Sequence, residues 1–404
     1  MGGAFVGTTQ LGLSLVGCIN VSGMAGVTER MTTRPPQTIL VASNTSWYLF
    51  NFRLNLMKEL SSSGYHVIAV APVDDYSERL RQLGIQFIPY SLDRRSINPL
   101  NELLALFRLC AIIRRLNPDL ILSYTPKINI YASLVARMFA VPIVNNVSGM
   151  GYAFIHKGIL ARLVTLMYRF ALSRSIKVFF QNNDDMRLFV NRIVSPAIAE
   201  RLPGSGVDIV RFAPTLALNR LDRFVFLLVA RMLRDKGIVE YVDAARIVHQ
   251  SFPDVEFDLL GFVDMQNPAP ISSEQITAWV KEGVVRYLGA TDNVKPYLAR
   301  ADCVVLPSYR EGTPRSLLEA AAMGKPIIAT DAIGCRDVVD DGVTGFFCKP
   351  RDADDLADKM LRMLRLSEDE RREMGTRGRE KMVREFDERI VLDKYMEVIR
   401  DILA

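Results

Sequence analysis

From residue 38 onward, short apolar runs alternate with longer stretches in which apolar residues recur every three or four positions. The short runs predict buried strands, and the longer stretches predict amphipathic helices. This alternation is typical of parallel sheets with helices on both faces, an α/β doubly wound architecture. The expected strands are 38–42, 66–71, 86–90, 120–123, 142–145 and 177–181, then 224–230, 256–261, 284–288, 303–306 and 326–330.

The strand series is interrupted at residues 202–208, Leu-Pro-Gly-Ser-Gly-Val-Asp, a cluster that suits an interdomain hinge. A chain of 404 residues also exceeds what one hydrophobic core usually supports. We therefore expect two doubly wound domains, over residues 38–205 and 206–404, behind a leader over residues 1–37. The tail from about Asp352 is expected to be helical, with Asp354 as its cap and the last helix crossing back to the first domain.

The leader differs from the rest of the chain. Residues 4–27 carry no charge and are rich in Gly, Ser and Thr. They lack the basic start of a signal peptide, and their hydropathy is modest for a spanning helix. We interpret the segment as a disordered leader, or as an over-long start with Met31 as the true first residue. A membrane-inserted segment is the alternative.

The composition is that of a globular protein, with 49% apolar and 24% charged residues. The five cysteines form no CxxC pair and one would be left over in any pairing, which favours a reducing, cytoplasmic compartment. The three histidines are also scattered, so no zinc site is expected.

The net charge of +5 is distributed unevenly, because the first domain is basic and the second acidic. No Asp or Glu lies between Asp119 and Asp184, a stretch with seven cations. A surface of one sign indicates an anionic partner, for which a nucleic acid, a membrane surface and phosphorylated substrates all qualify. These cations lack the interleaved aromatic residues of a recognisable nucleic-acid module, so no nucleic-acid partner is expected. They are Lys127, Arg137, Lys157, Arg162, Arg169, Arg174 and Lys177.

The strongest chemical signal is a pair of glutamates, Glu311 and Glu319, separated by seven residues directly after the expected strand 303–306. Pro314 suits the first turn of a helix because it has no N–H group to leave unpaired. The N–H groups around residues 315–317 would then form a cradle for a diphosphate at the positive end of the helix dipole. The alternative is that the two glutamates only stabilise the helix dipole, which acidic residues near a helix start do as often as they bind a ligand.

Two cations strengthen this interpretation. Arg231 and Lys236 follow the expected strand 224–230, and Gly237 comes next. Because both strands end at the same edge of one sheet, these cations would share a cleft with the helix start. Arg231 can bind phosphate oxygens in a forked arrangement, and Lys236 can supply a point charge. The alternative is a solvated charged loop.

These residues, with Gly204-Ser-Gly-Val-Asp208, Phe212-Ala-Pro214 and Gly289-Ala-Thr-Asp292, resemble the retaining GT-B glycosyltransferases of family four. The resemblance covers nearly all of residues 38–404 and implies a nucleotide-sugar donor, with UDP favoured, and no cofactor. It implies that Arg231 and Lys236 neutralise the donor diphosphate and that Glu311, with them, is catalytic. Glu319 would bind ribose hydroxyls, and Glu311 would bind the donor sugar. The remaining expected donor-binding residues are Gly206, Thr291, Asp292, Gly312, Thr313, Arg315, Ser316 and Leu317.

Three strand-end loops of the first domain, residues 44–53, 123–131 and 145–154, are expected to bind the acceptor. They look like those of the branch that acts on undecaprenyl-diphosphate-linked sugars, notably bacterial α-1,3-N-acetylgalactosaminyltransferases. Many family members carry a histidine beside the reacting centre, where this chain offers Lys127. The expected acceptor-binding residues are Asn44, Thr45, Ser46, Arg53, Lys127, Asn129 and Gly149.

The basic residues of the first domain also predict an anionic membrane surface as a partner. Lys157, Arg162 and Arg169 fall on one side of a helical stretch whose remainder is apolar, and Arg108, Arg114 and Arg115 add to them. We expect a peripheral protein at the cytoplasmic face of the membrane, acting on a lipid-linked sugar. A core-packed helix with a basic rim is the alternative.

Other functions stay open at this point: a sugar-nucleotide epimerase or phosphorylase of the same architecture, a glycosyltransferase with a soluble acceptor, or a basic binding protein. No metal is expected. Asp352-Ala-Asp354 is formally a DxD pair, but it lies at an expected helix start, where a capping role is the simpler interpretation.

Overall fold

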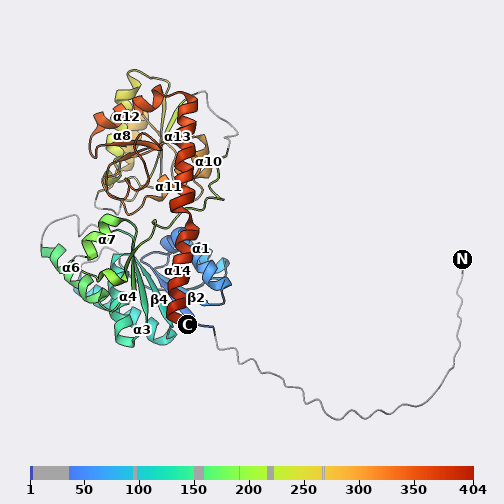
Figure 1. Cartoon of the computed structure of the whole chain (residues 1–404), viewed down its shortest axis with the longest axis vertical. Helices are drawn as coiled ribbons and strands as arrows, with labels where there is room; N and C mark the ends of the chain where they lie inside the picture. The colour runs from blue at the N-terminus through green and yellow to red at the C-terminus, as the bar shows by residue number, and fades with distance from the viewer. Residues whose placement is uncertain are drawn as a thin grey trace, which may run out of the picture. The chain divides into compact units, whose positions relative to one another are not determined.

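The structure is a computed structural model, which describes residues 1–2, 36–93, 98–149, 159–190, 192–215, 223–265, 267 and 269–404. The chain divides into Met1–Pro35 and one compact unit, Pro36–Ala404 (Figure 1). The expected leader therefore lies almost entirely outside the described residues, as do Lys157 and half of the loop 145–154.

The first sheet has seven parallel strands in the order β3-β2-β1-β4-β5-β6-β7. Strand β1 lies between β2 and β4, with Leu40 opposite Ile68 on one side and Ile121 on the other. Helices cover both faces, so central strands are buried throughout and appear as continuous apolar runs. The strands are β1 (Thr38–Ala42), β2 (His66–Ala71), β3 (Gln86–Pro89), β4 (Leu120–Tyr124), β5 (Ile143–Val147), β6 (Lys177–Phe180) and β7 (Ala199–Arg201).

The second sheet has six parallel strands in the order β10-β9-β8-β11-β12-β13. It repeats the plan of the first, because β8 is flanked by β9 and β11. Both sheets therefore have the doubly wound topology expected from the sequence. The strands are β8 (Val225–Val229), β9 (Glu256–Leu260), β10 (Arg286–Tyr287), β11 (Cys303–Leu306), β12 (Ile327–Thr330) and β13 (Gly345–Cys348).

Helices connect the strands of both sheets, and the 3₁₀ turns η1 (Pro196–Ile198) and η2 (Arg234–Lys236) and the π-helical turn η3 (Met382–Phe386) accompany them. The helices of the first part are α1 (Ser46–Ser62), α2 (Asp75–Gln82), α3 (Pro99–Leu116), α4 (Pro126–Phe139), α6 (Ile159–Leu172) and α7 (Asn183–Val190). Those of the second are α8 (Ile238–His249), α9 (Ser273–Lys281), α10 (Lys295–Arg300), α11 (Arg315–Ala322), α12 (Ala353–Arg365), α13 (Glu368–Lys381) and α14 (Glu388–Leu403).

The last helix, α14, packs on the first sheet although it follows the second domain in sequence (Figure 1). Val391, Tyr395 and Ile399 are buried in the same core cluster as Ile39 of β1. The Tyr395 hydroxyl accepts a hydrogen bond from Nδ2 of Asn146, at 3.1 Å. These contacts join the end of the chain to the first domain.

Each strand expected from the sequence is present, with its ends displaced by no more than two residues. Strands β7 and β13 were not expected. β7 has three residues and none of them is buried, so it has no apolar run. The cap of α12 was assigned wrongly: the carboxylate of Asp352, not Asp354, accepts the N–H of Asp355 at 2.9 Å.

Candidate active site

The loop after β11 enters α11 at Pro314, which stands one residue before the helix rather than inside its first turn. The Leu317 N–H donates to the Pro314 carbonyl oxygen at 3.0 Å, and the Leu317 side chain is fully buried. The sequence predicted that the N–H groups of residues 315–317 bind the diphosphate. Among these three, the N–H groups of Arg315 and Ser316 have no partner within the helix. The positive end of the helix dipole makes them suitable for binding an anion.

Lys236 and Glu311 are brought together from the ends of β8 and β11. The Nζ atom of Lys236 lies 2.6 Å from Oε1 of Glu311, and Oγ of Ser308 donates to the same oxygen at 2.8 Å. Gly237 makes this approach possible: its φ is +71°, and a Cβ there would lie 2.2 Å from the carbonyl oxygen of Pro307. The glycine after Lys236 is thus required by the close packing of two strand-end loops.

Arg231 extends from the end of β8 with 42% of its side chain exposed. Its Nη1 atom lies 3.2 Å from Oδ2 of Asp264, which is 18% exposed. The guanidinium therefore keeps donors available while the carboxylate restrains its direction.

Glu319 lies on the first turns of α11, and only 7% of it is exposed. Its Oε1 accepts a hydrogen bond from Nε of Arg315 at 2.7 Å. Burial raises the pKa of Glu319, and the neighbouring Arg315 opposes this rise. Arg315 also donates to the carbonyl oxygen of Asn51 on α1, so it joins the two domains beside the site.

A cavity of about 440 Å³ lies between the domains and gathers most of the residues expected to bind the donor. We call it the donor cavity. It falls in the size range of small-molecule sites, roughly 300–1,000 Å³. The expected residues that line it are Arg231, Lys236, Thr291, Asp292, Glu311, Arg315, Ser316 and Glu319.

A second cavity of about 550 Å³ adjoins the first, and we call it the second cavity. Arg231, Glu311 and Arg315 line both. Asn44 and Thr45, expected to bind the acceptor, line the second cavity, as do Gly312 and Thr313, expected to bind the donor.

Gly312 and Thr313 make direct contacts with the first domain. The Thr313 hydroxyl donates to the Gln181 carbonyl oxygen at 2.9 Å, and Nδ2 of Asn182 donates to the Gly312 carbonyl oxygen at 2.9 Å. Their observed role is therefore to join the domains at the edge of the second cavity.

Gly206 does not line either cavity. Its φ is +70°, and a Cβ there would lie 2.4 Å from Cα of Glu388, where the chain enters α14. This glycine is needed for a close backbone crossing, and its expected contact with the donor stays a prediction. Its neighbour Ser205 lines the second cavity.

Asp292 lines the donor cavity and also contacts the first domain. It accepts hydrogen bonds from the Tyr76 hydroxyl and from Nη1 of Arg79, the latter at 2.6 Å. These donors lower the pKa of Asp292. Thr291, beside it, accepts the N–H of Asn293 on its hydroxyl at 3.1 Å.

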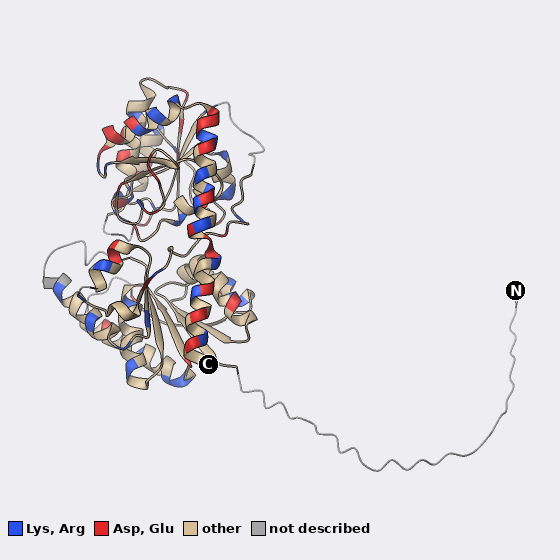
Figure 2. Ribbon diagram, viewed as in Figure 1, with Lys and Arg blue, Asp and Glu red and all other residues tan. Residues whose placement is uncertain are grey.

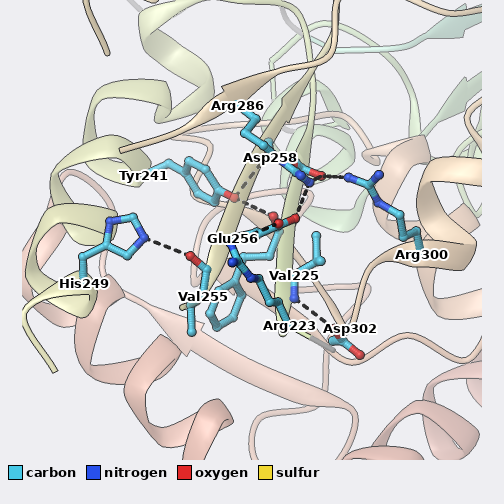
Figure 3. A network of polar contacts seen from close by, with 11 residues as sticks. Arg223, Val225, Tyr241, His249, Val255, Glu256, Asp258, Arg286, Arg300 and Asp302 are labelled. Atoms are coloured by element: carbon cyan, nitrogen blue, oxygen red, sulfur yellow. Dashed lines mark hydrogen bonds and ion pairs between the residues drawn. The ribbon is translucent and has the colours of Figure 1, made fainter. Parts of the chain in front are cut away.

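The loop that carries Thr291 and Asp292 is fixed at both ends by one buried carboxylate, Asp258 of β9 (Figure 3). Arg286, at the start of β10, donates through Nε at 2.8 Å, and Arg300, at the end of α10, donates through Nη2 at 2.9 Å. Asp258 is 2% exposed. It therefore acts from within the sheet on the geometry of the donor cavity.

Two residues expected to bind the acceptor are buried structural residues. The Ser46 hydroxyl lies within hydrogen-bond distance of Asp74 and of Ser77, the latter at 2.7 Å. Asn129 accepts from the Ser123 hydroxyl at 2.8 Å and donates to the Asn146 carbonyl oxygen at 2.9 Å. Both are fully buried, so their polar groups serve the first domain rather than a ligand.

Arg53 and Lys127, also expected to bind the acceptor, do not line either cavity. Arg53 is 2% exposed, its guanidinium carbon lies 4.5 Å from the centre of the Tyr124 ring, and it donates to the Tyr48 hydroxyl. Lys127 forms an ion pair with Glu102 of α3 at 2.8 Å. The remaining expected residue, Gly149, has a φ of +138° and follows Ser148, which lines the second cavity.

The sequence analysis missed several cavity residues: Trp47, Phe52 and Tyr76 from the first domain, and Arg211, Phe262 and Asp264 from the second. Trp47 was within an expected loop, but no motif singled it out. Phe262 and Asp264 follow the expected strand 256–261, and their strand-end position was the available signal.

Two parallel-sheet α/β domains with a cavity between them have the architecture of the GT-B fold. Residues 38–182 match the family model described as glycosyl transferase 4-like, and residues 223–366 match the model described as glycosyl transferases group 1. The chain belongs to this glycosyltransferase family, and it is an enzyme that transfers sugars.

Individual relatives agree with the family. The chain is 29% identical over 367 residues to the N,N'-diacetylbacillosaminyl-diphospho-undecaprenol alpha-1,3-N-acetylgalactosaminyltransferase of Campylobacter jejuni, covering 87% of this chain and 95% of the relative. It is 25% identical to the UDP-Gal:alpha-D-GlcNAc-diphosphoundecaprenol alpha-1,3-galactosyltransferase of Escherichia coli, covering 67% and 72%. Anabaena HepE in complex with UDP-glucose shares the fold, with a TM-score of 0.74, 18% identity and coverage of 90% and 99%.

Proposed function

We propose that this enzyme transfers a hexose or N-acetylhexosamine from a UDP-linked donor to a lipid-diphosphate-linked saccharide, with retention of the anomeric configuration, in surface glycan assembly. The observation that carries the proposal is the donor cavity, where Arg231 and Lys236 meet the start of α11 and Glu319 lies on the same helix. The names of the Campylobacter and Escherichia relatives support the acceptor class.

The donor diphosphate binds Arg231, Lys236 and the N–H groups of Arg315 and Ser316. Charge-assisted hydrogen bonds of this kind are about twice as strong as neutral ones. Glu319 accepts the ribose hydroxyls with the carboxylate that Arg315 orients. Glu311, held by Lys236 and Ser308, accepts hydroxyls of the donor sugar.

In the retaining reaction, an acceptor hydroxyl oxygen attacks the anomeric carbon on the face from which the diphosphate departs. The bond between that carbon and the diphosphate oxygen breaks, and the departing oxygen takes the proton of the acceptor hydroxyl. No separate base is required. Arg231 and Lys236 stabilise the charge that develops on the leaving diphosphate, the main electrostatic contribution to the rate.

A lipid-linked acceptor requires contact with the membrane. In the described part of the chain, no helix has the length and apolar character needed to span a bilayer. Helices α3 and α6 instead offer a surface for peripheral contact. Each of the two helices leaves large apolar side chains exposed at positions i, i+3, i+4 and i+7, and α4 packs against both. They are Leu100, Leu103, Leu104 and Phe107 of α3, and Leu163, Leu166, Met167 and Phe170 of α6. We call these eight residues the α3–α6 surface.

Cations surround the α3–α6 surface, as Figure 2 shows along these helices. Arg137 stacks on the Phe170 ring, with 4.6 Å from its guanidinium carbon to the ring centre. Exposed apolar stripes with basic neighbours favour shallow binding to anionic lipid. The exposed cations of this region are Arg108, Arg114, Arg115, Arg137, Arg162, Arg169 and Arg174.

The test is a transfer assay with UDP-linked glucose, galactose, N-acetylglucosamine and N-acetylgalactosamine. The acceptors are undecaprenyl-diphosphate-linked N-acetylglucosamine and N,N'-diacetylbacillosamine. The expected product has an α-linkage, which NMR coupling constants establish. UDP at 100 times its Kd should add about 2.7 kcal/mol to the free energy of unfolding. Absence of both stabilisation by UDP and transfer would contradict the proposal, and a β-linked product would contradict retention.

A further inference from the structure

The two cavities differ in charge. Four cations and three carboxylates line the donor cavity, whereas two cations and four carboxylates line the second cavity. A diphosphate is therefore favoured in the first and disfavoured in the second, which suits an uncharged ligand. The carboxylates of the second cavity are Asp74, Asp75, Asp264 and Glu311, and its cations are Arg231 and Arg315.

Aromatic side chains from both domains line the second cavity. The Trp47 ring centre lies 5.4 Å from that of Phe52 and 6.4 Å from that of Phe262, both in edge-on orientations. Neither of these two rings is therefore stacked parallel to the indole. An aromatic face beside carboxylates matches a pyranose ring, which has an apolar C–H face and a rim of hydroxyl donors.

The position of Trp47 is fixed by its neighbours. Its backbone N–H donates to Oδ2 of Asp74 at 3.0 Å, and the same carboxylate caps α2. Trp47 therefore lies where the starts of α1 and α2 are bound together. This places the Trp47 backbone at a fixed point of the cavity wall, so binding there does not have to order that part of the chain.

We infer that the second cavity binds the uncharged terminal saccharide of the acceptor, which stacks on Trp47 and donates hydroxyl hydrogen bonds to Asp75 and Asp264. The inference rests on the proposed function and specifies its acceptor site. Arg231 and Glu311 line both cavities, so a hydroxyl of this saccharide would face the donor sugar. The acceptor's own diphosphate stays outside the second cavity, because four carboxylates line it.

The experiment uses the two tryptophans of the chain as reporters. Trp279 is 5% exposed in the core of the second domain, so Trp279→Phe leaves Trp47 as the single indole. UDP binding is first measured by calorimetry. Methyl α-glycosides of glucose, galactose, N-acetylglucosamine and N-acetylgalactosamine are then titrated in the presence of saturating UDP, with N-acetylglucosamine 1-phosphate as the charged probe.

We expect a saturable change in the emission of the Trp279→Phe protein with at least one glycoside, and no change in the matched Trp47→Phe protein. The 1-phosphate should bind more weakly than the corresponding glycoside, and Asp75→Asn should weaken glycoside binding without changing the Kd for UDP. Normal UDP binding with no response to any glycoside would overturn the saccharide site and leave the proposed function standing. If the wild-type protein does not bind UDP, the proposed function itself is contradicted. Tighter binding of the 1-phosphate would overturn the exclusion of the diphosphate.

Discussion

Nζ of Lys236 lies 2.6 Å from Oε1 of Glu311, and the two side chains are only 13% and 16% exposed. They reach this position from loops after two neighbouring strands, β8 and β11. Arg231, which also lines the donor cavity, forms a second, more exposed pair with Asp264 of the second cavity. Each cation assigned to the donor diphosphate is thus held by a carboxylate at the place where it would act.

Removing either cation should slow transfer strongly and leave the fold intact. We expect Lys236→Ala and Arg231→Ala each to lose about 2–4 kcal/mol of transition-state stabilisation, a fall in kcat/KM of roughly 30- to 1,000-fold. Arg234→Ala is the matched control, because this exposed cation lies between them in sequence but does not line either cavity. Near-normal turnover in both variants would remove these residues from the diphosphate site.

The affinity for UDP should depend on the protonation of Glu319. Burial raises its pKa above the ordinary value of 4.5, so on acidification it becomes neutral at a higher pH than an exposed glutamate. The neutral form accepts ribose hydroxyls less well, so affinity should fall as the pH drops through this raised pKa. Calorimetry at several pH values compares the Kd for UDP of the wild type with that of Glu319→Gln. Protonation of the UDP phosphates affects both proteins equally, so the difference between the two profiles reports the protonation of Glu319. Parallel pH profiles would disprove the contact with the ribose.

The buried carboxylate of Asp258 should contribute to stability through Arg286 and Arg300 (Figure 3). Asp258→Asn would remove the charge partner of Arg300 and leave Arg286 with Glu256 alone, at 2.5 Å. Both arginines are more than 30% exposed, so water recovers part of the loss, and we expect about 2–3 kcal/mol less free energy of unfolding.

Urea unfolding measures this loss, and Asp243→Asn is the control. Asp243 pairs with Arg246 at the surface, with exposures of 46% and 37%, so its loss should cost less than about 1 kcal/mol. Equal effects of the two substitutions would show that Asp258 has no special part in the second domain.

Transfer should not require a metal ion. Arg231, Lys236 and the start of α11 already supply positive charge at the diphosphate, and Asp352 of the formal DxD pair caps α12. Activity in excess EDTA should therefore remain close to that of the untreated enzyme. Loss of activity in EDTA with recovery on adding Mn²⁺ would show that these cations are insufficient.

The sequence predicted the fold well because buried parallel strands are continuous apolar runs, which are visible without knowledge of their neighbours. Strand β13 was not predicted, because it begins at Gly345, a residue that disfavours strands in a local pattern. A glycine is needed there, since a Cβ would lie 2.1 Å from the Ile327 carbonyl oxygen. Its pairing with β12 is a tertiary property that the local pattern does not contain.

The two halves of the site differed in how far they could be predicted. Arg231, Lys236, Glu311 and Glu319 occupy a motif whose spacing follows from two strand ends and a helix start, and the structure brings them together. For Arg53, residue type was misleading, because a cation in a loop suggested phosphate while the side chain is buried among Tyr48, Tyr124 and Tyr395. Burial of that kind depends on α14, which arrives from the far end of the chain.

The α3–α6 surface should bind anionic vesicles in a salt-dependent manner. The basic residues attract lipid headgroups over about 8–10 Å at physiological salt, so binding should weaken as salt rises. Each cation near the surface contributes about 1 kcal/mol, so replacing Arg162, Arg169 and Arg174 with glutamine should weaken binding roughly a hundredfold. Co-sedimentation with anionic and with neutral vesicles across a salt series measures this.

The matched control replaces Arg372, Arg377 and Arg384, which are at least 50% exposed on the second domain, with glutamine. This control should bind vesicles normally, since its arginines lie on α13 and η3 of the second domain and not beside the α3–α6 surface. The first triple variant should keep its turnover on a short, water-soluble acceptor, because none of its substituted residues lines either cavity. Equal binding to neutral vesicles, or equal effects of the two triple variants, would mean that the exposed apolar stripes serve another partner. The glycosyltransferase assignment would then stand without its membrane surface.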